Sequence, residues 1–97
     1  MMTYLVLGER LKALRIANKM EQKVLGERVG VGKGAISSYE NAIRYPSYEV
    51  LLRIAAVFHV STDYLLGLDD TPKVSLEGLS EDNVRLVLEL VEALRGK

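Results

Sequence analysis

The side chains that could catalyse a reaction or hold a cofactor are few in this sequence. It has 97 residues with one histidine and no cysteine, which excludes disulfides and thiolate metal sites. His59 falls where a helix should end, the ordinary place for a cap or for a partner of the helix dipole. The glycines around Lys33 lack the Lys-Ser/Thr ending of a phosphate-binding loop, and no serine has a partner base. The sequence therefore predicts no enzyme, no cofactor, no metal site and no small-molecule substrate.

The polar residues that remain as candidates lie between Gln22 and Glu40, and two short helices must position them. Apolar residues recur there at helical spacing: Val24, Leu25 and Val29, then Ala35, Ile36 and Tyr39. Gly30 suits the positive φ that ends the first helix, and the outward face of the second is small and polar. Such a pair can be a helix-turn-helix, whose second helix enters the DNA major groove. A plain packed hairpin fits the same pattern, and Gly26 indicates a close helix crossing.

Charge is divided unevenly along the chain, although the formal net charge is zero. Residues 1–67 hold nine Lys or Arg and six Asp or Glu, a balance of +3, while residues 68–97 hold four and seven, a balance of −3. A basic front part suits phosphate binding, and an ordinary solvated surface produces the same counts. The opening residues lack the basic start of a signal peptide, and Glu9 interrupts their apolar run. We therefore expect a cytoplasmic protein without a membrane anchor.

Three further helices are predicted to complete an all-α domain of five helices over residues 1–67. The first is capped near Thr3, and its stripe is formed by Leu7, Leu11 and Leu14. After a loop over residues 41–46, Ser47 caps a fourth helix that His59 closes, and Ser61 caps a short fifth helix that ends at Gly67. The spacing places several residues in the core: Ile36, Tyr39, Tyr64, Leu65 and Leu66.

The C-terminal part is predicted to be a linker followed by one more helix. Residues 68–79 lack a helical period, and Ser80 caps a helix over residues 80–97 with two acidic residues in its first turn. Its apolar side is formed by Val84, Val87, Leu88, Val91 and Leu94. Because this side is wide, we expect the helix to hold a homodimer together. Docking of the helix back on its own domain is the alternative.

Several motifs follow one another along residues 7–67: LGERLKALR at 7–15, YEN at 39–41, RYPS at 44–47 and VSTDYLLG at 60–67. In these motifs the chain resembles the phage-repressor-like, or Xre-type, helix-turn-helix family. The resemblance covers about two thirds of the chain. It implies a five-helix domain that dimerises, binds palindromic operators in double-stranded DNA and represses, or less often activates, transcription.

The same resemblance implies roles for individual residues. Base edges would be contacted from the outward face of the second motif helix, by Lys33, Gly34, Ser37 and Ser38. Backbone phosphates would be bound by Gln22, Asn41 and Arg44. Arg15 and Glu40 match positions that pair in this family and tie the first helix to the recognition helix.

Four residues depart from the pattern of the family. Glu21 and Gly32 replace the small polar caps of helices two and three. Ala42 stands where glycine is common, so either Asn41 adopts the left-handed conformation or the loop bends differently. Gly34 removes a side chain from a base-reading position, so binding would rely on phosphates and DNA shape. The alternative function is a protein-interaction module, an antirepressor or an antitoxin, with weak or no specific DNA binding.

Overall fold

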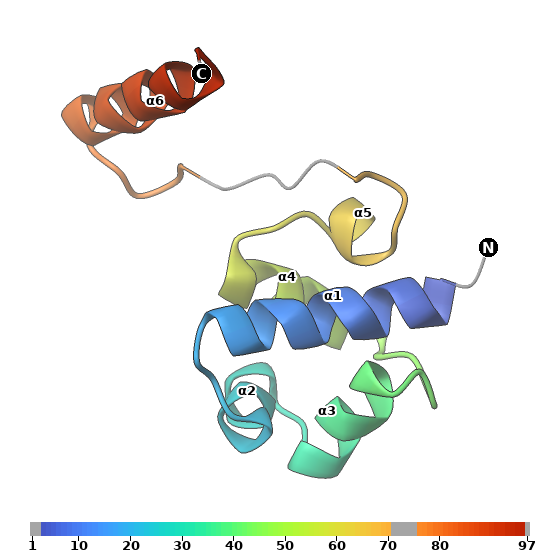
Figure 1. The fold of residues 1–97 in the computed structure, drawn as a ribbon. Coiled ribbons are helices and arrows are strands. Elements are labelled where there is room, and N and C mark those ends of the chain that lie inside the picture. The colour runs from blue at the N-terminus through green and yellow to red at the C-terminus, as the bar shows by residue number, and fades with distance from the viewer. Residues whose placement is uncertain (1–2, 71–75, 97) are drawn as a thin grey trace.

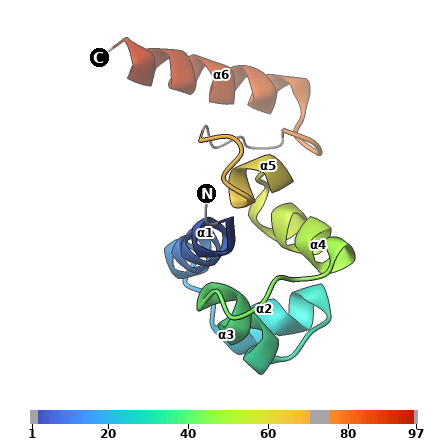
Figure 2. The ribbon, with the colours of Figure 1, turned by 90° about the vertical axis from the view of Figure 1, so that its right-hand side faces the viewer.

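The computed structural model describes residues 3–70 and 76–96, and within them the chain forms six helices and no strand (Figure 1). The helices are α1 (Thr3–Ala17), α2 (Gln22–Val29), α3 (Lys33–Glu40), α4 (Tyr48–Phe58), α5 (Thr62–Leu65) and α6 (Glu81–Arg95). Helices α1 to α5 pack into one unit, and α6 lies apart from it (Figures 1 and 2). The predicted all-α fold class is confirmed.

Three serines begin helices as the sequence predicts. The side-chain oxygens of Ser47, Ser61 and Ser80 each accept a hydrogen bond from the backbone N–H three residues later, at 3.2, 3.0 and 3.2 Å. Each bond satisfies one N–H that the helix itself leaves without a partner. Two boundaries differ from the prediction: α1 begins at Thr3, the residue expected to precede it, and α5 ends at Leu65 instead of Gly67.

The core draws at least one side chain from each of the first five helices. Seven side chains are at most 1% exposed: Leu7, Leu11, Leu25, Val29, Ile36, Ile54 and Leu65. Burying each such side chain contributes roughly 1.5–3 kcal/mol. Tyr64 and Leu66 were predicted to join them and are only half-buried: Leu66 packs against the outside of the core, and the Tyr64 ring lies against a guanidinium. The core fixes α3 against α1 and α2.

Two glycines allow backbones to approach each other around α3. A Cβ on Gly8 of α1 would lie 2.6 Å from the carbonyl oxygen of Glu40, so a larger residue would push α3 away from α1. A Cβ on Gly26 would lie 2.6 Å from the carbonyl oxygen of Val31. The close approach predicted for Gly26 is therefore real, but it is made to the turn between α2 and α3 and not to the α3 helix.

Arg10 holds the chain beyond α5 against α1. Its guanidinium lies 4.2 Å from the centre of the Tyr64 ring and donates to the carbonyls of Tyr64 and Asp69. It also donates to the Asp70 carboxylate at 2.8 Å. The five-helix unit thus includes the chain as far as Asp70.

Helix α6 has no buried residue. Its apolar side chains are mostly exposed, as at Leu88 (54%) and Leu94 (63%). In the described part of the chain no helix has the length and apolar content needed to cross a membrane. The described residues also contain no group of three or more side chains able to hold a metal ion.

Candidate nucleic-acid interface

Helix α3 buries one side and presents the other to solvent. Ile36 and Tyr39 face the core at 0% and 4% exposure. The four residues implied as base-reading lie on the other side: Lys33 and Gly34 are exposed, and Ser37 and Ser38 are half-buried. Nothing lies within 4 Å of where a Cβ on Gly34 would be. The first turn of α3 is therefore a bare backbone with one cationic side chain, narrow enough to approach a groove closely.

Beside this face, Arg15, Glu40 and Gln22 form one network that joins α1, α2 and α3. The Glu40 carboxylate accepts from Arg15 Nε at 2.6 Å and from Arg15 Nη2 at 3.1 Å, and its side chain is only 2% exposed. Gln22 Nε2 donates to Glu40 Oε1 at 3.1 Å. The amide of Gln22 is thus oriented at the first residue of α2, and its second N–H is not used by this bond.

The network also stabilises the charged form of Arg15. Its hydrogen bonds with Glu40 raise the pKa of the Arg15 guanidinium, burial opposes this, and the charge of Glu40 raises the pKa further. Arg15 Nη1 donates in addition to the carbonyl of Met20 at 2.8 Å. The guanidinium therefore stays charged while it fixes the end of α1 to both following helices.

An open groove of about 410 Å³ lies at the beginnings of α2 and α3. It is lined by Arg15, Glu21, Gln22, Lys23 and Lys33. Three of these side chains are cationic and one is acidic, and the N-terminus of α2 adds the positive end of a helix dipole. Glu21 precedes α2 without a side-chain capping bond, so the backbone N–H groups of the first turn are not occupied by it. The groove suits an anion such as a phosphate.

The loop after α3 holds the last two predicted contact residues. Asn41 Nδ2 donates to Ser37 Oγ at 3.3 Å, and Arg44 is exposed with its guanidinium 5.7 Å from the centre of the Tyr39 ring. Of the two alternatives expected for this loop, a left-handed Asn41 is wrong: Asn41 has φ −92°, and Ala42 itself takes the left-handed conformation with φ 59°. Backbone bonds from Ala42 and the residue after it to α3 carbonyls hold that conformation in place.

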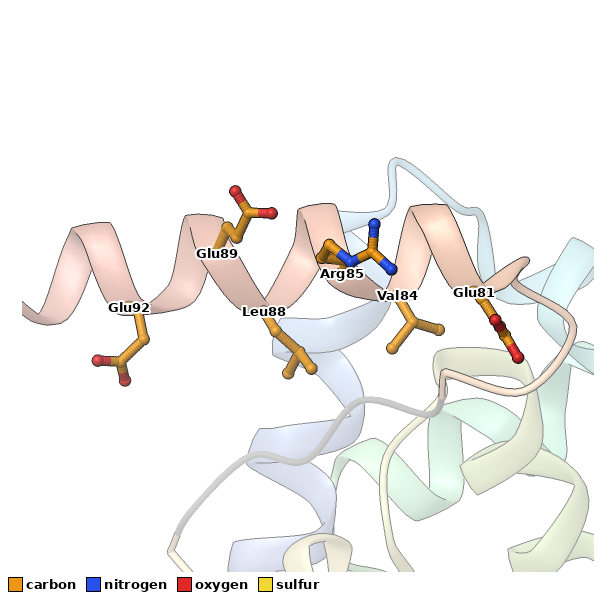
Figure 3. Close-up of a pocket in the computed structure, with 6 residues that line it drawn as sticks. All are labelled: Glu81, Val84, Arg85, Leu88, Glu89 and Glu92. Atoms are coloured by element: carbon orange, nitrogen blue, oxygen red, sulfur yellow. The ribbon is translucent and has the colours of Figure 1, made fainter.

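The predicted site residues thus fall into separate places. Gln22 and Lys33 line one groove, Asn41 lies next to Ser37, and Arg44 lies along the loop. The five residues predicted for dimerisation all lie on α6. Figure 3 shows two of them, Val84 and Leu88, which project from the same side of that helix.

Three residues that matter for this arrangement were not singled out in the sequence. Lys23 lines the groove, Gly8 permits the contact of α1 with α3, and Arg10 fixes the chain after α5. The first two had a signal: a lysine at the second position of a helix, and a glycine in a helix interior, where it costs roughly 1 kcal/mol. Arg10 had none, because its partners lie more than 50 residues away in sequence.

Comparison with known proteins places this geometry in a family. A family model described as helix-turn-helix matches residues 11–65. The chain is 33% identical to the HTH-type transcriptional regulator YobD of Bacillus subtilis, over 90% of this chain and 88% of that protein. It is similar in structure to the P22 c2 repressor solved in complex with a synthetic operator, with 41% identity, a TM-score of 0.63, and coverage of 65% of this chain and 96% of that one.

A second solved structure covers more of the chain. SinR, solved in complex with the SinI protein, matches 94% of this chain and 99% of its own, with 26% identity and a TM-score of 0.59. The match of the family to residues 11–65, together with the extent of the YobD similarity, decides the assignment. The chain belongs to the helix-turn-helix family of transcriptional regulators, in its phage-repressor-like, Xre-type branch.

Proposed function

We propose that the protein is a dimeric repressor that binds a palindromic operator with α3 in the major groove. The observation that carries this proposal is the exposed outward face of α3 beside the cationic groove at the start of α2. The similarity to the P22 c2 repressor, a protein solved in complex with an operator, supports operator binding and favours it over a protein-interaction module. The protein would act in the cytoplasm, where its DNA lies, by binding and not by catalysis.

In this proposal the bases are contacted by few side chains. Lys33 is long enough to donate to guanine O6 or N7, while Ser37 and Ser38 exchange hydrogen bonds with several bases. Gly34 contributes no side chain, and its open surroundings let the backbone of α3 come close to the base edges. Discrimination between sequences would therefore depend strongly on Lys33 and on the shape of the DNA.

Phosphates would be bound on both sides of α3. On one side, the first turn of α2 offers backbone N–H groups, the second amide N–H of Gln22 and the ammonium of Lys23. On the other side, Asn41 and Arg44 extend the contact along the loop. These contacts supply affinity that varies little with sequence.

Dimerisation through α6 would supply the affinity and specificity that the few base contacts at one half-site do not provide. Two linked units reach successive turns of the groove, which lie about 34 Å apart. The exposed apolar side of α6 supports this role. The similarity to SinR extends over 94% of the chain, a share that includes most of α6.

The test is selection of bound duplexes from a randomised pool, followed by fluorescence anisotropy on the enriched sequence. We expect a palindrome whose half-site centres are one turn apart. Lys33→Ala should weaken its binding by about 1–3 kcal/mol, roughly 5- to 150-fold, and relax the preference at one base position. Gln22→Ala should weaken binding at every salt concentration without changing the salt dependence, because an amide displaces no counterion.

Arg85→Ala is the matched control, since it removes one positive charge from α6 and not from the α3 face. It should bind the selected operator like the parent protein. Base reading by α3 would be contradicted if no sequence were enriched, or if Lys33→Ala and Arg85→Ala lost the same amount of binding affinity. A protein-interaction module would then be the better-supported function.

A further inference from the structure

The side chains of α6 are arranged as in a helix that pairs with another helix. Val84, Val87, Val91 and Leu94 recur at spacings of three, four and three, which aligns them in one seam. None of the four is buried in the described structure. Leu88 and Leu90 border the seam on its two sides, at 54% and 60% exposure. Figure 3 shows Val84 and Leu88 projecting from one side of α6 and Glu89 from the opposite side.

We propose that α6 pairs in antiparallel orientation with α6 of a second copy of the chain. The inference rests on the proposed dimeric function and names the orientation and register of the contact. The two-fold axis passes between the levels of Leu88 and Leu90. In this register Val84 lies across from the partner's Leu94, and Val87 lies across from the partner's Val91. The interface is isologous, so each contact occurs twice.

The residues beside the seam decide between the two possible orientations. In the antiparallel register Leu88 meets the partner's Leu88 and Leu90 meets the partner's Leu90. Glu81, in the first turn, meets the partner's Arg95 in the last turn, so opposite charges face each other at both ends. The helix dipoles are also opposed, which is the favourable arrangement.

A parallel pair would bring unlike residues together. In a parallel pair, a residue beside the seam of one helix faces the residue five positions later on the partner helix. Asn83 would then lie across from the partner's Leu88, and Leu90 across from the partner's Arg95. Both contacts place an apolar side chain against a polar one, and neither brings Glu81 to an arginine. The sequence of α6 therefore complements itself in the antiparallel orientation only.

The orientation has a consequence for DNA binding. A helix of 15 residues is about 22 Å long. In an antiparallel pair the two α6 N-termini lie at opposite ends of this length, so the two five-helix units leave the pair in opposite directions. Units separated in this way can reach half-sites in successive turns of the DNA.

Charge exchange tests the register. Glu81→Arg places like charges together at both ends of the pair, and we expect about tenfold weaker dimerisation by analytical ultracentrifugation. The double variant Glu81→Arg with Arg95→Glu should restore dimerisation to near the parent value, although both exchanged charges now oppose the helix dipole. Glu89→Arg makes the same charge change on the opposite side of α6 and should have no effect. No recovery in the double variant overturns the register.

Crosslinking tests the orientation, and the chain has no cysteine of its own to interfere. A mixture of Glu81→Cys and Arg95→Cys proteins should crosslink to each other with a short bismaleimide. Neither should crosslink to itself, because its two copies would be about 21 Å apart. A dimer in which Glu81→Cys crosslinks to itself overturns the antiparallel pair but leaves the dimeric regulator. A protein that is monomeric at micromolar concentration overturns both, and operator binding measured on the same samples shows whether DNA recognition survives.

Discussion

Neutralising Glu40 should cost the five-helix unit a large part of its stability. In the parent protein the Arg15 guanidinium, 14% exposed, has its charge balanced by the Glu40 carboxylate at 2.6 Å. Glu40→Gln keeps the shape of the side chain and one acceptor oxygen but removes the charge. Arg15 is then left as a charge mostly removed from water, with hydrogen bonds to the Met20 carbonyl and to the one oxygen that the amide keeps. Glu40→Gln also disturbs the bond that orients Gln22.

The size of the effect follows from the burial. Removing one partner of a fully buried ion pair costs about 3–5 kcal/mol. Because Arg15 keeps some exposure and the new amide keeps one hydrogen bond, we expect about 2–3 kcal/mol. A unit of this size is stable by roughly 4–10 kcal/mol, so the loss should lower Tm by roughly 10–20 °C.

Urea and thermal unfolding followed by circular dichroism measure this loss. Glu49→Gln is the matched control, since Glu49 is 80% exposed and 3.6 Å from Arg53, and it should cost below about 1 kcal/mol. The raised pKa of Arg15 means that its contribution is complete below the unfolded pKa and is lost only as the pH rises through the folded one. The contribution of Arg15 to the free energy of unfolding should therefore be constant around neutral pH. If Glu40→Gln costs no more than the control, the pair does not hold α1 to α3.

Four other substitutions test the backbone geometry and the contacts of Arg10. Gly8→Ala should destabilise the protein by about 1–3 kcal/mol, because the new Cβ would meet the carbonyl oxygen of Glu40. Gly34→Ala should stabilise it by about 0.5–1 kcal/mol, because the new Cβ would lie in open space. If urea unfolding shows that both substitutions change the stability in the same direction, this reasoning is wrong. Ala42→Gly should raise Tm, since φ 59° costs alanine about 1 kcal/mol, and a lower Tm would refute the strain. Arg10→Ala should speed hydrogen exchange in the segment after α5 while α2 stays protected, and unchanged exchange would mean that Arg10 does not hold it.

Prediction from the sequence worked best where structure depends on near neighbours. The serine caps at Ser47, Ser61 and Ser80 act on an N–H three residues away, so the signal and its effect share one helix turn. It worked less well where two choices have similar energy. At Ala42 the residue type argues against a left-handed conformation, yet the packing of the loop on α3 imposes it. Tyr64 has the period of a core residue but lies at the edge of the core, under Arg10.

The helices and the outward side of α3 could be predicted from the sequence alone, because the period of apolar residues and the caps act within a few residues. The polar groups that contact one another, by contrast, depend on how the helices pack together. Glu40 is 25 residues from Arg15 and 18 from Gln22, and the crossing of α1, α2 and α3 brings the three together. The same crossing places Lys23 and Lys33 in one groove. Contacts of this kind depend on the angles and distances between helices, which core packing sets and no local pattern encodes.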